Sequence, residues 1–256
     1  MAEYVYDQAF ADERERLAGI ERLWDPATQE IMMRLGIAPG WRCLEVGAGG
    51  GSMVEWMAER VGAGGRVLAT DVYTKFLEAI ERPNVEVRQH DILAGEPLEA
   101  EFDLVYARLV VEHLGTGALR RMAEAVRPGG ILLLEDYDWA SVAVDPPQEE
   151  FEKVSDAVLG LMADAGFDPN FGRRLPAELE AAGLENVEAD GRVRLVRGGT
   201  PETAFFRLSV GSLREPLVQR DLLTEDEIDR ALAGFDDPAT TGLSPILVAG
   251  WGRRPN

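Results

Sequence analysis

Five short apolar segments alternate with helical patterns between Trp41 and Trp139, and this alternation restricts the fold more than any other feature of the chain. Each apolar segment is continuous, which is typical of a strand that is buried on both faces. Strands that alternate with helices are joined by right-handed crossovers, so they form a parallel sheet with helices on both sides. The expected strands lie within residues 41–47, 65–72, 85–92, 102–113 and 131–139, and the helices between them within 52–62, 74–81 and 117–130.

The residues on either side of this core are mostly helical in pattern. Apolar side chains recur at helical spacing within residues 12–24. A second helix is expected over residues 25–37, with Asp25 as its cap and Pro26 at its first position. After the core we expect a helix within 146–167, a helix and a strand within 175–199, further helices within 200–235 and a last strand within 244–254.

The composition excludes several classes of protein. Apolar residues make up 46% of the chain, but no apolar run is long enough to span a bilayer, and the charged N-terminus lacks the apolar stretch of a signal peptide. We therefore expect a cytoplasmic protein with no membrane partner. The formal net charge of −20 repels nucleic-acid phosphates, so we expect no nucleic-acid partner. Cys43 is the only cysteine, so no zinc site of the usual Cys and His spacing is available, and no metal is expected.

A glycine-rich turn, Leu44–Ser52, joins the first strand of the core to the first helix. In an open parallel sheet, ligands bind at the carboxyl ends of the strands, so this turn is the default binding site. Glycine is needed where a ligand lies against the backbone. The dinucleotide pattern G-x-G-x-x-G requires a third glycine at the position of Ser52, whereas the glycines here are Gly47, Gly49 and Gly51.

Acidic residues follow the next two strands. Asp71 ends the second strand about twenty residues after the glycines, where a carboxylate can accept hydrogen bonds from both hydroxyls of a ribose. Asp91 follows the third strand in the segment "QHDIL". Each of these two aspartates also has an alternative, purely structural role. For Asp71 it is to cap a helix that starts at Thr74, and for Asp91 it is to cap a short turn before Ile92.

Together these segments resemble the class I S-adenosylmethionine (SAM)-dependent methyltransferases over about Trp41–Trp139. The resemblance is carried by "LEVGAGGGS", "ATDV", "VRQHDI", "FDLVYARLVVEHL" and "RPGGILLLEDYDW". The whole chain is also similar to a group of actinobacterial methyltransferase-domain proteins, through these segments and the late "LSPILVAGWGRR".

The resemblance implies SAM as the cofactor and S-adenosylhomocysteine (SAH) as its product. In that family the glycine turn packs against the amino-acid end of SAM, and an acidic residue that matches Glu45 organises the ammonium group. The residue that matches Asp71 binds the ribose, and the residue that matches Asp91 accepts a hydrogen bond from the adenine amine. The implied cofactor-binding residues are Glu45, Gly47, Ala48, Gly49, Gly51, Asp71, Val72, His90, Asp91, Ile92, Ala107 and Arg108.

The resemblance also implies the fold and its division. We expect an α/β, Rossmann-like, doubly wound fold with a mostly parallel seven-stranded sheet, helices on both faces, and N-terminal and late helical cap elements. The whole chain, 1–256, is expected to be a single domain. It consists of an N-terminal helical cap (1–40), a SAM-binding core (41–140) and a C-terminal part (141–256) that carries a helical substrate lid at about 200–237.

The expected activity is transfer of the SAM methyl group, by in-line displacement, to an O, N or C atom of a small molecule, such as a secondary metabolite. Such a reaction depends mainly on alignment of the reactants, and a hydroxyl or carbon acceptor also needs a base. His113 follows the fourth strand and is the first candidate base, and Asp136 is the second. The expected substrate-binding residues are Tyr137, Trp139, Phe205 and Phe206, and the aromatic residues Tyr4, Tyr6 and Trp24 are expected to cap the site.

Several alternatives stay open at this point. One is an enzyme that binds SAM but catalyses a non-methylating reaction such as a cyclisation; others are a nicotinamide oxidoreductase and a non-catalytic SAM-binding module. Single residues have alternatives as well. The alternative role of His113 is to pack the turn instead of acting as a base, and that of Tyr137 and Trp139 is to belong to the core. For Arg108 the alternatives are a cofactor contact and an ion pair with a carboxylate of the substrate or of the protein. The oligomeric state is open, with a homodimer among the alternatives.

Overall fold

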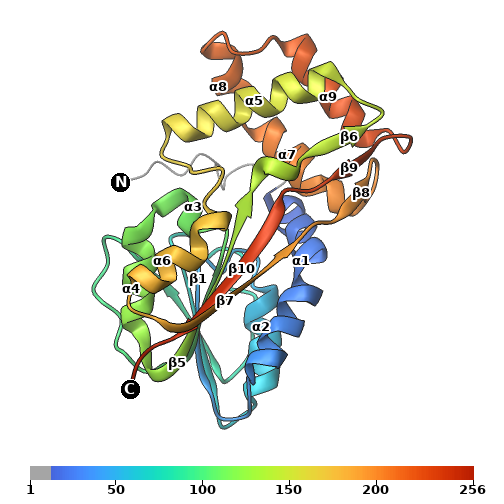
Figure 1. Cartoon of the computed structure of the whole chain (residues 1–256). Coiled ribbons are helices and arrows are strands. Elements are labelled where there is room, and N and C mark those ends of the chain that lie inside the picture. Colours follow the sequence, from blue (N-terminus) through green and yellow to red (C-terminus); the bar gives the residue numbers. More distant parts are fainter. Residues whose placement is uncertain (1–12) are drawn as a thin grey trace.

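The computed structural model describes residues 13–256, and within them the largest element is a seven-stranded sheet (Figure 1). Its strand order is β3-β2-β1-β4-β5-β10-β7. The five strands from β3 to β5 are parallel, and β10 runs antiparallel to both of its neighbours. The strand order reverses between β1 and β4, which is where ligands bind in sheets of this kind. The strands are β1 (Arg42–Val46), β2 (Arg66–Asp71), β3 (Val85–Gln89), β4 (Phe102–Arg108), β5 (Val126–Asp138), β7 (Glu185–Arg192) and β10 (Ile246–Arg253).

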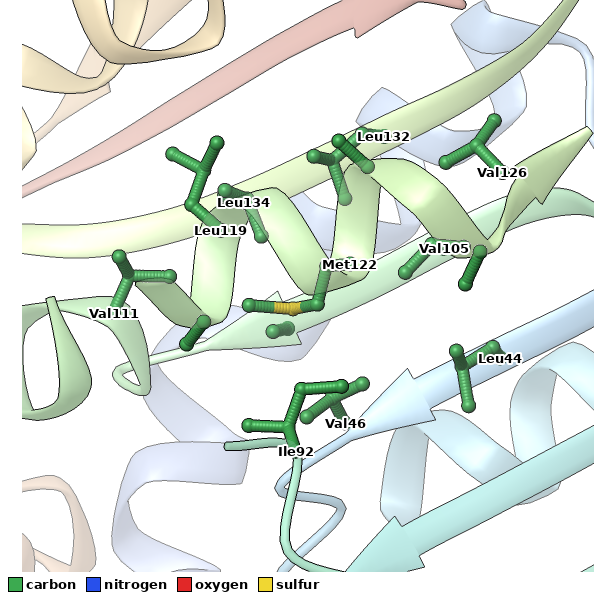
Figure 2. Packing of buried hydrophobic residues seen from close by; sticks show 14 of the residues in the cluster. Leu44, Val46, Ile92, Val105, Val111, Leu119, Met122, Val126, Leu132 and Leu134 are labelled. Carbon is green, nitrogen blue, oxygen red and sulfur yellow. The ribbon is translucent and has the colours of Figure 1, made fainter. Parts of the chain in front are cut away.

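Helices cover both faces of this sheet, as the sequence predicts for strands that are apolar throughout (Figure 1). On one face, α1 (Glu13–Leu35) and α2 (Ser52–Val61) pack on side chains such as Cys43 and Leu133. On the other face, α4 (Thr116–Ala125) and α6 (Leu175–Ala181), with the short α3 (Val111–Leu114), pack on side chains that include Leu44, Val105 and Leu132 (Figure 2). The fold is therefore the expected α/β, doubly wound architecture.

A second body of structure lies beyond the carboxyl ends of the parallel strands, and we call it the cap (Figure 1). Its helices share a core that includes Val154, Leu161, Leu213 and Ile228. The cap also contains a three-stranded antiparallel sheet of order β6-β9-β8, which the sequence patterns do not predict. The cap consists of α5 (Glu149–Asp164), α7 (Ala204–Ser212), α8 (Arg214–Gln219), α9 (Glu225–Asp236), β6 (Ala143–Asp145), β8 (Leu195–Arg197) and β9 (Thr241–Leu243). Short 3₁₀ turns occur at Trp139–Ser141, Gly172–Arg174 and Pro201–Thr203. No helix in the described part of the chain is long and apolar enough to cross a membrane.

The N-terminal region forms one helix instead of the two that the sequence predicts. Helix α1 continues through Pro26, and Asp25 lies inside it rather than at its cap. A proline inside a helix costs about 3 kcal/mol. Burial on both sides offsets this cost, because Trp24 and Ile31 are both buried against the sheet and Asp25 forms an ion pair with Arg108 at 2.8 Å.

The helix predicted within residues 74–81 is also absent, and the structure has turns there. Pro83 follows closely and disfavours a helical conformation at the preceding residue, so the chain must become extended before β3 begins at Val85. The segment still contributes apolar contacts, because Leu77 is fully buried and packs beneath the glycine turn.

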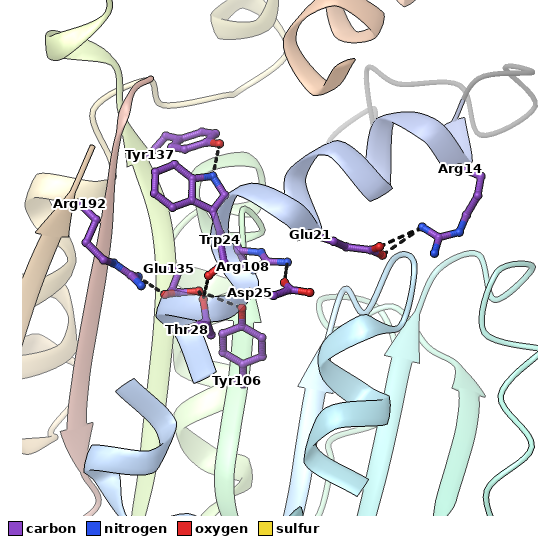
Figure 3. A network of polar contacts seen from close by, with 10 residues as sticks. All are labelled: Arg14, Glu21, Trp24, Asp25, Thr28, Tyr106, Arg108, Glu135, Tyr137 and Arg192. Carbon is purple, nitrogen blue, oxygen red and sulfur yellow. Dashed lines mark hydrogen bonds and ion pairs between the residues drawn. The ribbon is translucent and has the colours of Figure 1, made fainter. Parts of the chain in front are cut away.

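A buried network of polar side chains fixes α1 to the sheet (Figure 3). Its centre is the carboxylate of Glu135 on β5, which is fully buried. Thr28 of α1 donates a hydrogen bond to Glu135 Oε2 at 2.7 Å, Tyr106 of β4 donates to the same oxygen at 2.9 Å, and Arg192 of β7 forms an ion pair with Oε1. One turn away, Trp24 Nε1 donates to the hydroxyl of Tyr137 at 2.8 Å. The network therefore joins α1 to three strands.

Removing this carboxylate should destabilise the protein strongly. We expect Glu135→Ala to lower the free energy of unfolding by about 3–5 kcal/mol, because Arg192 keeps its charge without a partner in a buried site. Urea denaturation followed by circular dichroism measures the change. The matched control is Glu86→Ala, which breaks the exposed ion pairs with Arg66 and Arg88 and should cost no more than about 1 kcal/mol. Equal losses in the two variants would show that the network does not stabilise the fold.

Candidate functional site

One cavity of about 820 Å³ lies between the carboxyl ends of the parallel strands, helix α1 and the cap. Its position at the strand-order reversal agrees with the sequence expectation that the glycine turn lines a binding site. The cavity has two parts of different chemistry. Charged side chains from α1 and the strand ends line one part, and mostly apolar side chains from the cap line the other.

The glycine turn contributes backbone without side chains to the first part. Gly47 has a φ of 70°, and a Cβ there would lie 2.6 Å from Val110 Cγ2. Gly50, which sequence reasoning did not single out, lines the cavity, and a Cβ there would lie 2.0 Å from Glu21 Oε1 on α1. Glu21 in turn pairs with Arg14 at 3.1 Å (Figure 3). Helix α1 therefore reaches this turn through the Glu21 side chain, and a larger residue at Gly50 would have to displace that carboxylate.

Gly51 has a different role from the one expected. It does not belong to the cavity wall that the described residues form. It adopts a left-handed conformation at the start of α2, and a Cβ there would lie 2.7 Å from Ile80 Cδ1 and 3.0 Å from Leu77 Cδ2. Glycine at this position therefore permits packing of the 74–81 segment. Ala107 was also expected to touch the cofactor. It is likewise not among the described residues that line the cavity.

Asp71 links the glycine turn to the end of β2. Its Oδ2 accepts a hydrogen bond from the backbone N–H of Gly49 at 3.0 Å, and its Oδ1 accepts one from Tyr73 at 3.0 Å. Burial raises the pKa of this carboxyl, although these backbone hydrogen bonds oppose the change. Asp71 lines the cavity, and it does not cap a helix at Thr74, because the chain forms turns there.

Asp91 both caps a short turn and lines the cavity. Its Oδ1 accepts hydrogen bonds from the backbone of Leu93 at 2.8 Å and Ala94 at 3.1 Å, so it does organise a short turn. The side chain also lines the cavity, as do its neighbours His90 and Ile92. The cavity wall at this end therefore consists of two aspartates from adjacent strand ends, with an apolar side chain beside them.

Glu45 and Arg108 lie at the ends of the adjacent strands β1 and β4, and each has a buried polar atom without a partner. Glu45 Oε2 and Arg108 Nη1 are inaccessible to solvent and form no hydrogen bond within the described residues. Burial raises the pKa of Glu45, and the nearby charge of Arg108 opposes that rise. Arg108 forms an ion pair with Asp25, so one carboxylate that it contacts belongs to the protein (Figure 3). Unsatisfied buried polar atoms are costly, so this part of the cavity is built to receive further polar groups.

All of the expected cofactor-binding residues except Gly51 and Ala107 meet on the wall of this one cavity. The residues that the structure brings together there are Glu45, Gly47, Ala48, Gly49, Asp71, Val72, His90, Asp91, Ile92 and Arg108.

His113 and Glu112 lie where the two parts of the cavity meet. Burial and the charge of Arg16 lower the pKa of His113 to about 4, so the imidazole is neutral at pH 7. Its ring lies tilted against Phe167, 4.9 Å away between centroids. Glu112 Oε1 lies 3.7 Å from His113 Nε2, and burial and the neighbouring Asp136 raise the pKa of the Glu112 carboxyl. Sequence reasoning missed Glu112, although its position next to His113 was a signal for it.

Asp136, the second expected base, is not part of the cavity wall that the described residues form. Its side chain is buried behind the cavity wall that the described residues form, and its Oδ1 accepts a hydrogen bond from the backbone N–H of Glu112 at 3.2 Å. It positions the turn after β4, and the sequence expectation of a second catalytic base at Asp136 is not supported. An acidic residue at the end of a central strand can bind either a ligand or the next turn, and the sequence does not distinguish these cases.

The expected acceptor-side residues Tyr137, Trp139, Phe205 and Phe206 all line the cavity. Their rings form a continuous aromatic group, with Tyr137 5.7 Å from Trp139 and Phe205 5.2 Å from Phe206 between centroids. Trp24, which was expected to cap the site, is a core residue that supports Tyr137 from behind. Tyr4 and Tyr6 lie outside the described residues.

Comparisons with known proteins agree with this geometry. Residues 44–134 match the methyltransferase domain family. The protein "Methyltransferase str2" of Strobilurus tenacellus is 34% identical over 146 residues, which are 55% of this chain and 52% of that protein. This chain spans about half the length of the curated relatives it matches.

Two solved structures illustrate the likeness in fold. One is phosphoethanolamine N-methyltransferase 2 of Haemonchus contortus in complex with phosphomonomethylethanolamine and S-adenosylhomocysteine; it aligns with a TM-score of 0.56 at 18% identity and covers 91% of this chain and 53% of that one. The other is the 4+2 cyclase SpnF, with a TM-score of 0.51 at 17% identity, 90% of this chain and 80% of that one. The comparisons therefore show a match to the methyltransferase domain family over residues 44–134 and a fold that this chain shares with solved methyltransferases.

Proposed function

We propose that this chain binds SAM and transfers its methyl group to a small-molecule acceptor. The observation that carries the proposal is the convergence of the glycine turn, Glu45, Asp71 and Asp91 on one part of a cavity whose other part is apolar. A nucleoside and an acceptor can therefore lie side by side in one closed space. The secondary-metabolite acceptor and the cytoplasmic location stay predictions from the sequence.

The residues of the charged part fit SAM. Gly47, Gly49 and Gly50 line the cavity with backbone, and Ala48 between them adds only a methyl group, so a ligand can lie close to the main chain. The unpaired carboxyl oxygen of Glu45 suits a ligand ammonium group. Asp71 and Asp91 lie on the same wall and supply carboxylate acceptors for ribose hydroxyls and for the adenine amine. We assign these roles to the four residues by the match between their positions and the family's motifs.

SAM supplies an electrophilic methyl group on a sulfonium that is already a good leaving group. The contribution of the chain is then mainly to hold the two reactants in line and to exclude water, which in well-oriented systems is worth up to about 7–11 kcal/mol. Helix α1 closes the glycine-turn side of the cavity, and α5 and α7 wall the acceptor side. Gly19 permits this closure, because a Cβ there would lie 2.7 Å from the backbone N of Phe205 on α7.

A hydroxyl acceptor must also lose a proton, and Glu112 is better suited to accept it than His113. A base works best when its pKa is near the operating pH. The pKa of His113 is depressed to about 4 by burial and Arg16, which makes its imidazole a poor proton acceptor. The pKa of Glu112 is raised by burial and Asp136, which makes its carboxylate a stronger base than an ordinary glutamate. Glu112 therefore takes the proton, and the neutral His113 beside it contacts the acceptor.

A non-methylating reaction on bound SAM is the second candidate, because the fold of this chain is also that of a cyclase. Incubation with methyl-labelled SAM and a panel of acceptors separates the two. Label in the acceptor supports methyl transfer, whereas rearranged acceptor with the label retained in SAM supports the second candidate.

Binding of SAH should depend on Asp71. In isothermal titration calorimetry we expect saturable binding of SAH by the intact chain, weakened about 10- to 100-fold in Asp71→Ala, since hydrogen bonds to charged groups are worth about 1.5–3 kcal/mol. The matched control is Asp156→Ala, which removes an exposed carboxylate on α5 and should leave the affinity unchanged. If the folded wild-type protein does not bind SAH, the proposed function is wrong.

The pH dependence of transfer to a hydroxyl acceptor should report Glu112. Because the base must be deprotonated, kcat/KM should rise with pH to a plateau, with its midpoint above the ordinary pKa of a glutamate. Glu112→Gln should lower kcat by about 10²–10⁴-fold and remove this limb of the profile. The control is Glu99→Gln, which changes an exposed glutamate and should leave both kcat and the pH profile unchanged. If Glu112→Gln keeps the wild-type pH profile, a group other than Glu112 accepts the proton of the acceptor.

A further inference from the structure

The acceptor part of the cavity is walled almost entirely by uncharged side chains. In a chain that is 28% charged, none of the lining residues from Trp139 onward within the described structure is Asp, Glu, Lys or Arg. Helix α5 shows this most clearly, because the stripe that faces the cavity consists of Phe151, Val154, Ser155, Val158, Leu159 and Met162.

Three hydroxyl side chains on this wall direct their hydrogens to the protein itself. Ser209 donates to the carbonyl of Phe205 at 2.6 Å, Thr203 donates to the carbonyl of Thr200 at 2.8 Å, and Ser244 donates to the carbonyl of Pro245 at 2.8 Å. These three hydroxyls therefore do not offer their hydrogens to an anionic ligand, and Trp139 Nε1 is an uncharged buried donor that has no partner within the described residues.

Charge at the boundary of this part is compensated within the protein. Arg16 forms two hydrogen bonds of 2.7 Å to the carboxylate of Glu13, and both side chains are buried. The guanidinium also lies over the ring of Phe205, 5.3 Å from its centroid. A phosphate or carboxylate in the acceptor part would have to compete with Glu13 for this cation, and burial of a charge without a partner is costly.

Aromatic side chains supply the remaining contacts. Trp139 and Phe206 meet edge to face at 6.4 Å between centroids, and Phe151 and Phe235 meet at 5.6 Å. Such surfaces bind flat, apolar ring systems well.

We infer that the acceptor is an uncharged, largely apolar molecule with an aromatic or alicyclic ring system, and that phosphorylated or carboxylated acceptors are rejected. This inference rests on the proposed function, because it assigns SAM to the charged part of the same cavity. It also separates this chain from its Haemonchus contortus structural neighbour, which was solved with a phosphorylated amine.

The test compares two probes that share one ring system, 1-naphthol and 1-naphthyl phosphate, by calorimetric titration of the SAH-saturated protein. We expect 1-naphthol to bind at least about ten-fold more tightly than 1-naphthyl phosphate. Ser155→Arg places a cation on the cavity-facing stripe of α5, and it should reduce or reverse this preference by about ten-fold. Ser155→Gln adds comparable polar bulk without charge, and it should keep the wild-type preference.

The outcomes separate this inference from the proposed function. If SAH binds but 1-naphthyl phosphate binds as tightly as 1-naphthol or more tightly, or 1-naphthol does not bind, the inferred acceptor class is wrong. If Ser155→Arg binds SAH normally and keeps the wild-type preference, the inference is wrong as well, because α5 then does not select against charge. Absence of SAH binding would instead overturn the proposed function.

Discussion

The buried carboxylate of Glu135 is the interaction on which the architecture of the site depends. It accepts hydrogen bonds from Thr28 of α1 and Tyr106 of β4 and pairs with Arg192 of β7. An anion that is fully buried tolerates little movement of its partners, because each lost contact leaves an uncompensated charge. Helix α1 is therefore held in one position, and that position brings Glu21 against Gly50 and Arg16 towards the acceptor part of the cavity.

The cavity beside this fixed helix has two chemically different parts. At the strand ends, the acidic side chains of Glu45, Asp71 and Asp91 line the cavity together with the glycine turn. On the cap, the wall is aromatic and aliphatic. Glu112 lies at the boundary, where burial strengthens its carboxylate as a base. In the proposed reaction, these two parts would hold an electrophile with a charged end beside an apolar nucleophile.

The sequence predicted the elements whose signals are local. Continuous apolar runs identified the strands, and the spacing of Thr224 and Glu227 matches the capping box observed at the start of α9. Local rules failed at Pro26 and in residues 74–81. At Pro26, burial on both sides outweighed the proline, and in residues 74–81 a helical pattern gave way to turns that pack Leu77 beneath the glycine turn. In both places contacts distant in sequence outweighed local preference, and no window of the sequence contains those contacts.

The sequence by itself determined the layered fold and the gathering of these residues on one wall of a cavity, because glycines and acidic residues at strand ends must meet at the carboxyl edge of a parallel sheet. Only the tertiary structure decided which of those residues face the cavity: Gly50 rather than Gly51, and Glu112 rather than Asp136. It also decided the character of the acceptor part, which α1, α5, α7 and the small sheet of the cap build together. The physical reason is that side-chain direction and burial, and hence pKa and charge compensation, depend on packing between segments far apart in the chain.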